Sequence, residues 1–329
     1  MNRLRVLVLG GAGYIGSHTV LALREKGFEP VVLDDFSRGH RAAVAGAELI
    51  EADFTGVDLA GVLKESGCGA VMHFAAASQV GESIQRPELY YRNNVVGGLT
   101  LLDAMVAARV RYLIFSSSAA VYGEPCRIPI GEDHPTVPVN PYGATKLAFE
   151  GAMRWYAQAF DLRYVSLRYF NAAGAHPSGL IGEDHHPETH LVPLVLKAAM
   201  EGRPVSVFGN DYPTADGTCI RDYIHVSDLA DAHLLALQAL LDGAPGAVYN
   251  LGNGLGYSVL QVIETAGRIT GRDIGVAFAP RRPGDPAELV AGAGRAEAGL
   301  GWRPRYPELE TIVAHAWRWH QAHPCGYSG

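Results

Sequence analysis

Tyr142 and Lys146 stand four residues apart, and an Asn140-Pro141 pair precedes them. Asn140 can cap a helix and Pro141 fits a first helical turn, so the sequence predicts a helix that begins here. Residues at i and i+4 share a helix face, which places a phenol beside an ammonium group. The positive charge is expected to lower the pKa of the Tyr142 phenol from about 10 toward neutrality. Such a tyrosine can act as a general acid or base, although this spacing alone also occurs on ordinary surface helices.

Ser118 is a second candidate for the same chemistry. It closes a serine triplet that follows a strand-like run over residues 111–115. A hydroxyl group at the end of a strand can hold the reacting oxygen of a substrate while Tyr142 transfers the proton. Tyr142, Lys146 and Ser118 are therefore the predicted catalytic residues.

A glycine-rich turn near the N-terminus provides the elements around this chemistry. An apolar run over residues 4–9 leads directly into Gly10, Gly13 and Gly16, and residues 17–26 have a helical pattern. Strand, glycine turn and helix in this order place a pyrophosphate at a helix N-terminus, where backbone N–H groups can reach it. The sequence thus predicts a dinucleotide-binding loop.

Asp34 indicates which dinucleotide is bound. It ends a second strand-like run over residues 30–33 and lies eighteen residues beyond Gly16. A carboxylate there can accept a hydrogen bond from a ribose 2′-hydroxyl and would repel a 2′-phosphate. NAD is therefore favoured over NADP, although Arg38 and Arg41 lie nearby in the sequence.

Composition limits the class of protein. The chain has 329 residues, 48% of them hydrophobic, a net charge of −7 and a sequence pI near 6.0. These values argue against a nucleic-acid or anionic-membrane partner, and no apolar run approaches the length of a membrane span. The cysteines lack metal or redox spacing and are expected to be free thiols in a cytoplasmic protein; they are Cys68, Cys126, Cys219 and Cys325.

Alternation of strand-like and helical segments predicts an α/β fold, a Rossmann-type doubly wound parallel sheet with a smaller, irregular C-terminal substrate lobe. The first lobe is expected over residues 1–171, with a return near 222–251, and the second mainly over 172–329. Residues 89–108 and 222–241 are expected to be helical, and 172–189 a loop. Ligands bind such sheets beyond the strands' carboxyl ends, so the residues at those ends should share one crevice: Asp34, Asp53, Phe74, Ser118 and Asn171.

The chain resembles the extended short-chain dehydrogenase/reductase family and, within it, the sugar-nucleotide 4-epimerases. The resemblance extends over essentially the whole sequence. It is carried by Gly-Gly-Ala-Gly-Tyr-Ile-Gly-Ser-His-Thr (10–19), His-Phe-Ala (73–75), Val-Gly-Glu-Ser (80–83), Asn-Asn (93–94), Ser-Ser-Ser-Ala-Ala-Val-Tyr-Gly (116–123), Asn-Pro-Tyr-Gly (140–143), Arg-Tyr-Phe-Asn (168–171), Gly-Ala-His-Pro-Ser-Gly (174–179), Phe-Gly-Asn-Asp-Tyr (208–212), Gly-Thr-Cys-Ile-Arg-Asp-Tyr-Ile-His (217–225) and Arg-Arg-Pro-Gly-Asp (281–285).

The resemblance implies a homodimer that retains NAD and inverts C4 of a UDP-hexose, converting the glucose and galactose forms. Tyr142 would take the 4-hydroxyl proton, C4 would pass hydride to NAD, and the 4-keto sugar would turn before hydride returns. It also implies two sets of contacts. Around NAD it places Gly10, Gly13, Tyr14, Ile15, Gly16, Asp34, Asp53, Phe54, Phe74, Ala75, Ala76, Ser78, Asn93, Lys146 and Phe170. Around the UDP-sugar it places Ser118, Tyr142, Asn171, His190, Leu191, Ser206, Phe208, Arg221, Arg282, Asp285 and Leu289.

Three positions depart from the family pattern. Ser78 stands where many members have lysine, and His190 where many have the asparagine that contacts the hexose. Leu289 stands where tyrosine or cysteine is common and side-chain size gates N-acetylated sugars. Because leucine is smaller than tyrosine, UDP-GlcNAc and UDP-GalNAc are further candidate substrates.

The sequence leaves other functions open. Another NAD-dependent sugar-nucleotide epimerase would share these motifs. A 4,6-dehydratase would need an Asp-Glu pair where the chain has Ala119-Ala120, which cannot transfer protons. An NAD-sensing regulatory protein would typically lack Tyr142 or Lys146. His185, His186 and His190 lie close to Glu183 and Asp184, but only His186 and His190 have ligand spacing, so no metal site is expected.

Overall fold

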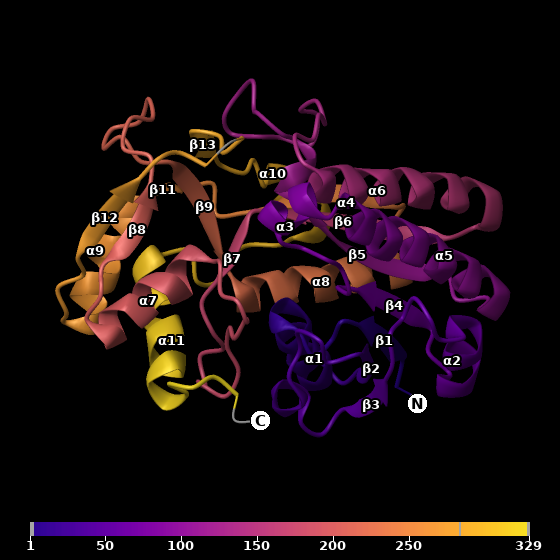
Figure 1. The fold of residues 1–329 in the computed structure, drawn as a ribbon. Helices are drawn as coiled ribbons and strands as arrows, with labels where there is room; N and C mark the ends of the chain where they lie inside the picture. Colours follow the sequence, from indigo (N-terminus) through magenta and orange to yellow (C-terminus); the bar gives the residue numbers. More distant parts are fainter. Residues whose placement is uncertain (1–2, 283, 328–329) are drawn as a thin grey trace.

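A parallel sheet of seven strands forms the first lobe of the computed structural model, which describes residues 3–282 and 284–327. Pro283 of the 281–285 motif lies outside them. The strand order is β10-β6-β5-β4-β1-β2-β3, so the doubly wound prediction is confirmed (Figure 1). The chain runs from β1 outward to β2 and β3 and then crosses back to β4 on the other side of β1. The order of the strands therefore reverses between β1 and β4, which is where such sheets bind ligands. The strands are β1 Arg5–Leu9, β2 Glu29–Asp34, β3 Glu48–Glu51, β4 Ala70–His73, β5 Tyr112–Ser118, β6 Arg163–Tyr169 and β10 Ala247–Leu251.

Helices cover both faces of this sheet because the central strands are apolar on both sides. On β1, Val6 and Val8 pack into one core cluster, whereas Leu7 and Leu9 pack into the other. The first cluster lies under α1 Tyr14–Glu25, α8 Val226–Leu241 and α10 Gly294–Leu300. The second lies under α2 Leu59–Ser66, α5 Gly97–Ala108 and α6 Pro141–Phe160. This division follows from the two-residue side-chain period of a strand.

The helix expected over residues 89–108 is interrupted. After α3 Val80–Gln85, the chain forms α4 Pro87–Tyr90, a π-helical turn over Tyr91–Val96 and then α5. Asn94, in the π-helical turn, accepts a hydrogen bond from Ala77 N at 2.9 Å and donates to Ala77 O and Thr145 Oγ1 at 3.0 Å each. The turn therefore ties the loop after β4 to α6.

The second lobe is built on two small sheets. One contains β11 Gly256–Ser258, β9 Ile220–His225, β13 Glu288–Leu289 and β7 Asn171–Ala173, and the other pairs β8 Val205–Phe208 with β12 Val276–Ala279. Its helices are α7 Leu191–Glu201, α9 Val259–Thr270 and α11 Leu309–Ala322, which share a third core cluster (Figure 1). Short 3-10 turns occur at Arg41–Val44 and Ala119–Val121.

The helix expected from Asp222 begins later. Residues up to His225 belong to strand β9, and α8 starts at Val226. The prediction failed because Tyr223 and Ile224 extend the apolar pattern of α8 backward, while their pairing with β7 lies far away in the sequence. The loop expected over residues 172–189 begins with the end of β7. Of the helices in the described residues, none is long and apolar enough to cross a bilayer.

Candidate active site

Helix α6 presents Tyr142 in its first turn, as the sequence predicts. Asn140 Oδ1 accepts a hydrogen bond from Gly143 N at 2.9 Å, and Pro141 occupies the first helical position. Gly143 lets the helix start lie against the backbone after β5, since a Cβ there would lie 2.2 Å from Ala120 O. The cap and this close contact together set where Tyr142 stands relative to Ser118.

Lys146 lies under Tyr142 with its side chain almost fully enclosed. Its Nζ donates to Ser116 O at 2.8 Å and lies 5.8 Å from the centroid of the Tyr142 ring. Burial lowers the pKa of the Lys146 ammonium to about 7, and the carboxylate of Glu150 opposes that shift. Lys146 is therefore a group that changes charge near neutral pH.

The predicted direction of the Tyr142 pKa was wrong for the protein alone. Burial raises the pKa of the phenol above its ordinary value, and the hydroxyl of Ser118 acts in the lowering direction as a hydrogen-bond partner. Spacing alone indicated a neighbouring charge but could not reveal how far the ring is removed from water.

Ser118 closes strand β5 beside the start of α6. Its Oγ accepts a hydrogen bond from Ala120 N at 3.1 Å. Two residues earlier, Ser116 forms a short hydrogen bond with the hydroxyl of Tyr169, a partly buried residue near Tyr142. Ser116 and Tyr169 are not among the predicted site residues, although both lie in family motifs of the sequence.

A buried ion pair supports α6 from below. Glu150, one turn beyond Lys146, pairs with Arg168 of β6, and both side chains are 7% exposed. Glu150 Oε1 also accepts from Ser117 Oγ at 2.6 Å, while Arg168 Nη1 donates to Tyr122 OH at 2.9 Å. Tyr122 in turn donates to Asn250 Oδ1 of β10 at 2.6 Å. These bonds fix α6 to the three strands at this end of the sheet.

The glycine loop has the shape that a dinucleotide requires. Gly10 has φ +72°, and a Cβ on Gly16 would lie 2.3 Å from Gly10 O, so neither position accepts a side chain. A Cβ on Gly13 would meet only Gly10 O, at 3.4 Å, which leaves the outer side of the loop open. Helix α1 begins here without a side-chain cap. The open loop at a helix N-terminus fits the pyrophosphate of NAD.

Asp34 is fixed beside this loop. Its carboxylate accepts hydrogen bonds from Ala12 N and Phe36 N, both at 2.9 Å, and burial raises its pKa. The two nearby arginines have other partners: Arg38 donates to His186 O at 2.8 Å, and Arg41 pairs with Glu51. The acidic end of β2 therefore suits a ribose hydroxyl better than a 2′-phosphate.

The other residues predicted to contact NAD fall into two groups. Most surround the carboxyl ends of β1, β4 and β6 and the π-helical turn beside them; these are Tyr14, Ile15, Phe74, Ala75, Ala76, Ser78, Asn93 and Phe170. The others follow β3, at the edge of the sheet. Asp53 is exposed and accepts hydrogen bonds from Thr55, and Phe54 is buried in the core with its ring centroid 5.3 Å from that of His73.

The second lobe brings four of the predicted UDP-sugar residues close to one cavity. Arg221 of β9 forms an ion pair with Asp285, and the Arg282 guanidinium lies 4.0 Å from the centroid of the Phe208 ring. A cavity of about 520 Å³ lies beside them, lined by Arg282 and Asp285 and also by Glu124, Tyr212, Pro213, Arg281, Gly284 and Ala287. Tyr212 and Arg281 are not among the residues predicted for this site. The Arg282 guanidinium covers one face of the Phe208 ring, and Phe208 is a predicted contact of the UDP-sugar.

The remaining substrate candidates of the second lobe lie at four places. Leu289 of β13 pairs in register with Arg221 and packs with Phe170 on the cluster around Ala119 and Tyr122. Ser206 is exposed on β8, two residues before Phe208, and Asn171 begins β7. His190 and Leu191 stand at the start of α7, but His190 Nδ1 lies 2.6 Å from Glu183 Oε1. His190 is thus joined to its own loop.

Comparison with known proteins gives a consistent result. Residues 6–252 match the model of the NAD dependent epimerase/dehydratase family. The chain is 52% identical over 327 residues to a UDP-glucose 4-epimerase of Halalkalibacterium halodurans, covering 99% of this chain and 98% of the other. The crystal structure of UDP-glucose 4-epimerase from Brucella ovis in complex with NAD is 48% identical, with a TM-score of 0.93 and coverage of 95% and 97%. A UDP-glucose 4-epimerase from Bifidobacterium longum in complex with NAD⁺ and UDP is 39% identical, with a TM-score of 0.92 and coverage of 98% and 100%.

Proposed function

The chain belongs to the NAD dependent epimerase/dehydratase family, and we propose that it interconverts UDP-glucose and UDP-galactose at C4 through a transient 4-keto sugar. The observation that carries this proposal is the meeting of Tyr142, Ser118 and Lys146 at the sheet edge that also holds the glycine loop. The cavity lined by Arg281 and Arg282 supports a diphosphate-linked substrate, because guanidinium groups suit phosphate oxygens.

The chemistry that NAD supplies when bound at the glycine loop is reversible hydride transfer at C4 of the sugar. Tyr142, as phenolate, takes the proton of the 4-hydroxyl group and later returns it to the same oxygen, acting first as base and then as acid. Ser118 holds that oxygen. Because burial raises the pKa of the phenol, the phenolate depends on nearby positive charge, and the Lys146 ammonium provides one such charge.

Replacing Tyr142 with phenylalanine tests the proposal. Tyr142→Phe is expected to lower kcat by roughly 10²–10⁴-fold, the usual contribution of a positioned acid–base group, while the unfolding temperature stays the same. The assay is conversion of UDP-galactose by purified protein without added NAD, with the sugar products separated by chromatography. Tyr156→Phe is the matched control, since Tyr156 lies on the same helix and bonds Asp103 at the surface. Full activity of Tyr142→Phe would exclude this phenol as the base.

A wider substrate range is the second part of the proposal. Leu289, like Phe170, packs on the cluster that contains Ala119, the residue after Ser118, so its size affects the space near the sugar. With leucine in this place, we expect comparable turnover of UDP-GlcNAc and UDP-glucose. Leu289→Tyr should reduce turnover of the acetylated sugar and spare that of UDP-glucose. If wild-type protein shows no turnover of UDP-GlcNAc, the wider range is wrong.

The proposal also includes a homodimer in a reducing compartment such as the cytoplasm. Large apolar side chains are exposed on α6 and on the π-helical turn: Trp155, Phe160, Tyr91 and Val96. Exposed apolar groups of this kind are typical of an interface.

The cysteines are free thiols, which fits the proposed reducing compartment. Light scattering during size-exclusion chromatography tests the dimer, and a monomer at micromolar concentration would contradict it.

A further inference from the structure

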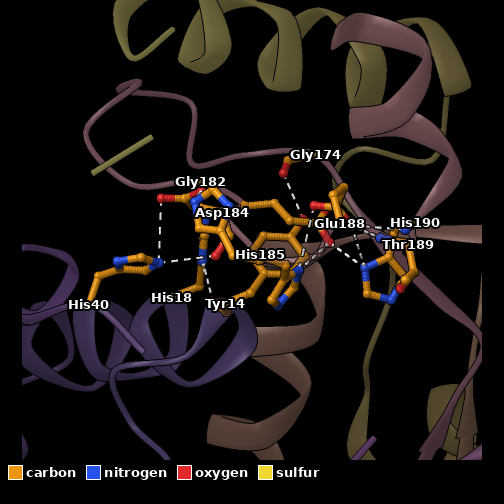
Figure 2. A network of polar contacts seen from close by, with 12 residues as sticks. Tyr14, His18, His40, Gly174, Gly182, Asp184, His185, Glu188, Thr189 and His190 are labelled. Atoms are coloured by element: carbon orange, nitrogen blue, oxygen red, sulfur yellow. Dashed lines mark hydrogen bonds and ion pairs between the residues drawn. The ribbon is translucent and has the colours of Figure 1, made fainter. Parts of the chain in front are cut away.

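The loop between Glu183 and His190 gathers four potential metal ligands. One oxygen or nitrogen atom from each of Glu183, His185, Glu188 and His190 lies within 4.8 Å of all the others. Figure 2 shows His185, Glu188 and His190 beside Tyr14, which begins α1. His185 Nδ1 lies 3.3 Å from Glu183 and 3.7 Å from Glu188, and His190 Nδ1 lies 3.4 Å from Glu188.

Burial of Glu183 is the second observation. Its side chain is only 4% exposed, and its Oε1 has no hydrogen-bond partner among the described residues. His185 Nδ1 is likewise buried without one. Both imidazole nitrogens approach Oε1 without the alignment of a hydrogen bond. A buried carboxylate oxygen left in this way is costly unless a cation lies beside it.

We propose that Glu183, His185, Glu188 and His190 bind a divalent first-row transition metal, with zinc the best match. Metal–ligand distances of about 2.0–2.1 Å in a tetrahedron correspond to ligand–ligand distances of about 3.3 Å. The His185–Glu183 distance of 3.3 Å and the His190–Glu188 distance of 3.4 Å lie close to that value. The 2.6 Å His190–Glu183 distance must lengthen, and the 3.7 Å His185–Glu188 distance, which involves the other Glu188 oxygen, must shorten. Two imidazoles disfavour Ca²⁺ and Mg²⁺, which prefer oxygen ligands.

This site is structural rather than catalytic, because all four ligands come from the protein. The loop also contacts the first lobe. His185 lies edge-on to the Tyr14 ring at 6.1 Å, and His40 Nε2 lies 3.0 Å from Asp184 O. Helix α7 begins directly after His190. The metal therefore fixes the loop between the dinucleotide loop and α7, and this inference does not depend on which sugar the protein converts.

The competing occupant is the proton. Without a metal, the carboxylates raise the pKa of His185 to about 9 and that of His190 to about 10, against the effect of burial. Two imidazolium groups would then balance two carboxylates. Metal and proton compete for the same nitrogen atoms, so binding must release protons. The experiment has to separate these two states.

The metal content of the untagged, full-length protein decides between the metal-bound and the protonated state of the cluster. After chelator treatment and gel filtration, we expect Zn²⁺ titration to give one tightly bound equivalent per chain by mass spectrometry, with a higher unfolding temperature. His185→Gln and Glu188→Gln should each weaken Zn²⁺ binding at least tenfold. His186→Gln is the matched control, because this histidine of the same loop is exposed, pairs with Asp184 and lies outside the cluster. It should bind as the wild type does.

Cobalt provides a readout that needs no variant, in case a substitution prevents folding. Co²⁺ in the wild-type protein should give the intense visible bands of a tetrahedral site without thiolate charge transfer, and Zn²⁺ should abolish them. Absence of stoichiometric binding, a six-coordinate Co²⁺ spectrum, or unchanged binding in a folded His185→Gln protein would overturn the proposal. Because these are binding measurements, they are independent of epimerase activity.

Discussion

Lys146 occupies a position where its own charge is unfavourable for folding. Its side chain is 3% exposed, and burial lowers its pKa to about 7. Between that pH and its ordinary pKa, the unfolded chain binds a proton that the folded chain does not. The free energy of unfolding therefore rises with pH between these two pKa values. Below the folded-state pKa, the buried ammonium destabilises the fold by its full amount. A group kept under these conditions points to a function beyond stability.

Removal of this amine should separate activity from stability. Lys146→Met is expected to lower kcat by roughly 10²–10⁴-fold, because the Tyr142 phenolate loses its neighbouring charge. The unfolding temperature at pH 7 should stay the same or rise, since the buried charge is gone. Initial rates and calorimetry measure the two effects. Lys64→Met, on the exposed side of α2, should change neither quantity. A large loss of stability in Lys146→Met would indicate a mainly structural lysine.

At the scale of elements, the π-helical turn connects the cofactor side of the site to the catalytic helix. Asn94 is 3% exposed, and its side chain makes four hydrogen bonds: two with the backbone of Ala77, one to Thr145 Oγ1 and one from Asn93 Nδ2. Any shift of this turn would therefore move the loop after β4 relative to α6. Turns of this kind are frequent at functional sites.

Asn94→Ala should destabilise the protein by about 2–3 kcal/mol, because each lost hydrogen bond contributes about 1 kcal/mol and the partly buried backbone groups of Ala77 remain unpaired. Urea unfolding measures the change. We also expect faster loss of bound NAD during dialysis, since the loop after β4 is released. Thr100→Ala removes only an exposed hydrogen bond to Val96 O, so it should cost less than about 0.5 kcal/mol. Equal stability of the two variants would contradict the role of Asn94.

Local sequence signals predicted the elements that are coded locally. The cap at Asn140, the glycine loop and the strands ending at Asp34 and Ser118 follow from short patterns, and the structure has them. The strand over Ile220–His225 was missed because its partners come from residues far away in the chain. The burial of a side chain likewise depends on residues far away in the chain. For that reason the predicted lowering of the Tyr142 pKa was wrong.

The metal-ligand cluster shows the same limit from another side. In the sequence, only His186 and His190 have the spacing of metal ligands. In the structure, His190 shares the cluster with His185, while His186 forms an ion pair with Asp184. The backbone path through this short loop decides which side chains meet. Residue spacing alone cannot provide that path, since ligand spacing rules assume a regular helix or a known motif.

At the scale of the whole molecule, buried histidines set the response to acid. Burial lowers the pKa of four of them, to about 4 for His18, about 3 for His73, about 2 for His225 and about 4 for His233. Below the ordinary histidine pKa the unfolded chain binds protons that the folded chain excludes, so stability is lost as pH falls. Asp222 and Asp228, with pKa values raised to about 6, act in the opposite direction between pH 6 and their ordinary pKa.

The stability lost through the four histidines on acidification should exceed the stability gained through the two aspartates, so acid should destabilise the fold. We expect the free energy of unfolding to fall between pH 6.5 and pH 5.0 by a few kcal/mol. Urea denaturation at fixed ionic strength measures it. His233→Gln should show a shallower fall than the wild type, whereas a variant of the exposed His186 should not. Equal or greater stability at pH 5.0 would mean that other groups dominate.

The order of strands in the sheet also has a consequence for synthesis. Strand β10 and helix α8 complete the first lobe, but they follow β7, α7, β8 and β9 of the second lobe in the chain. Helix α1 packs against α8, so its apolar face stays uncovered while the ribosome is still producing the intervening segments. The nascent chain must therefore hold a half-built Rossmann lobe until residues 226–251 emerge. A fragment ending at residue 171 would retain the glycine loop and Tyr142 and yet expose that apolar face to chaperones or aggregation.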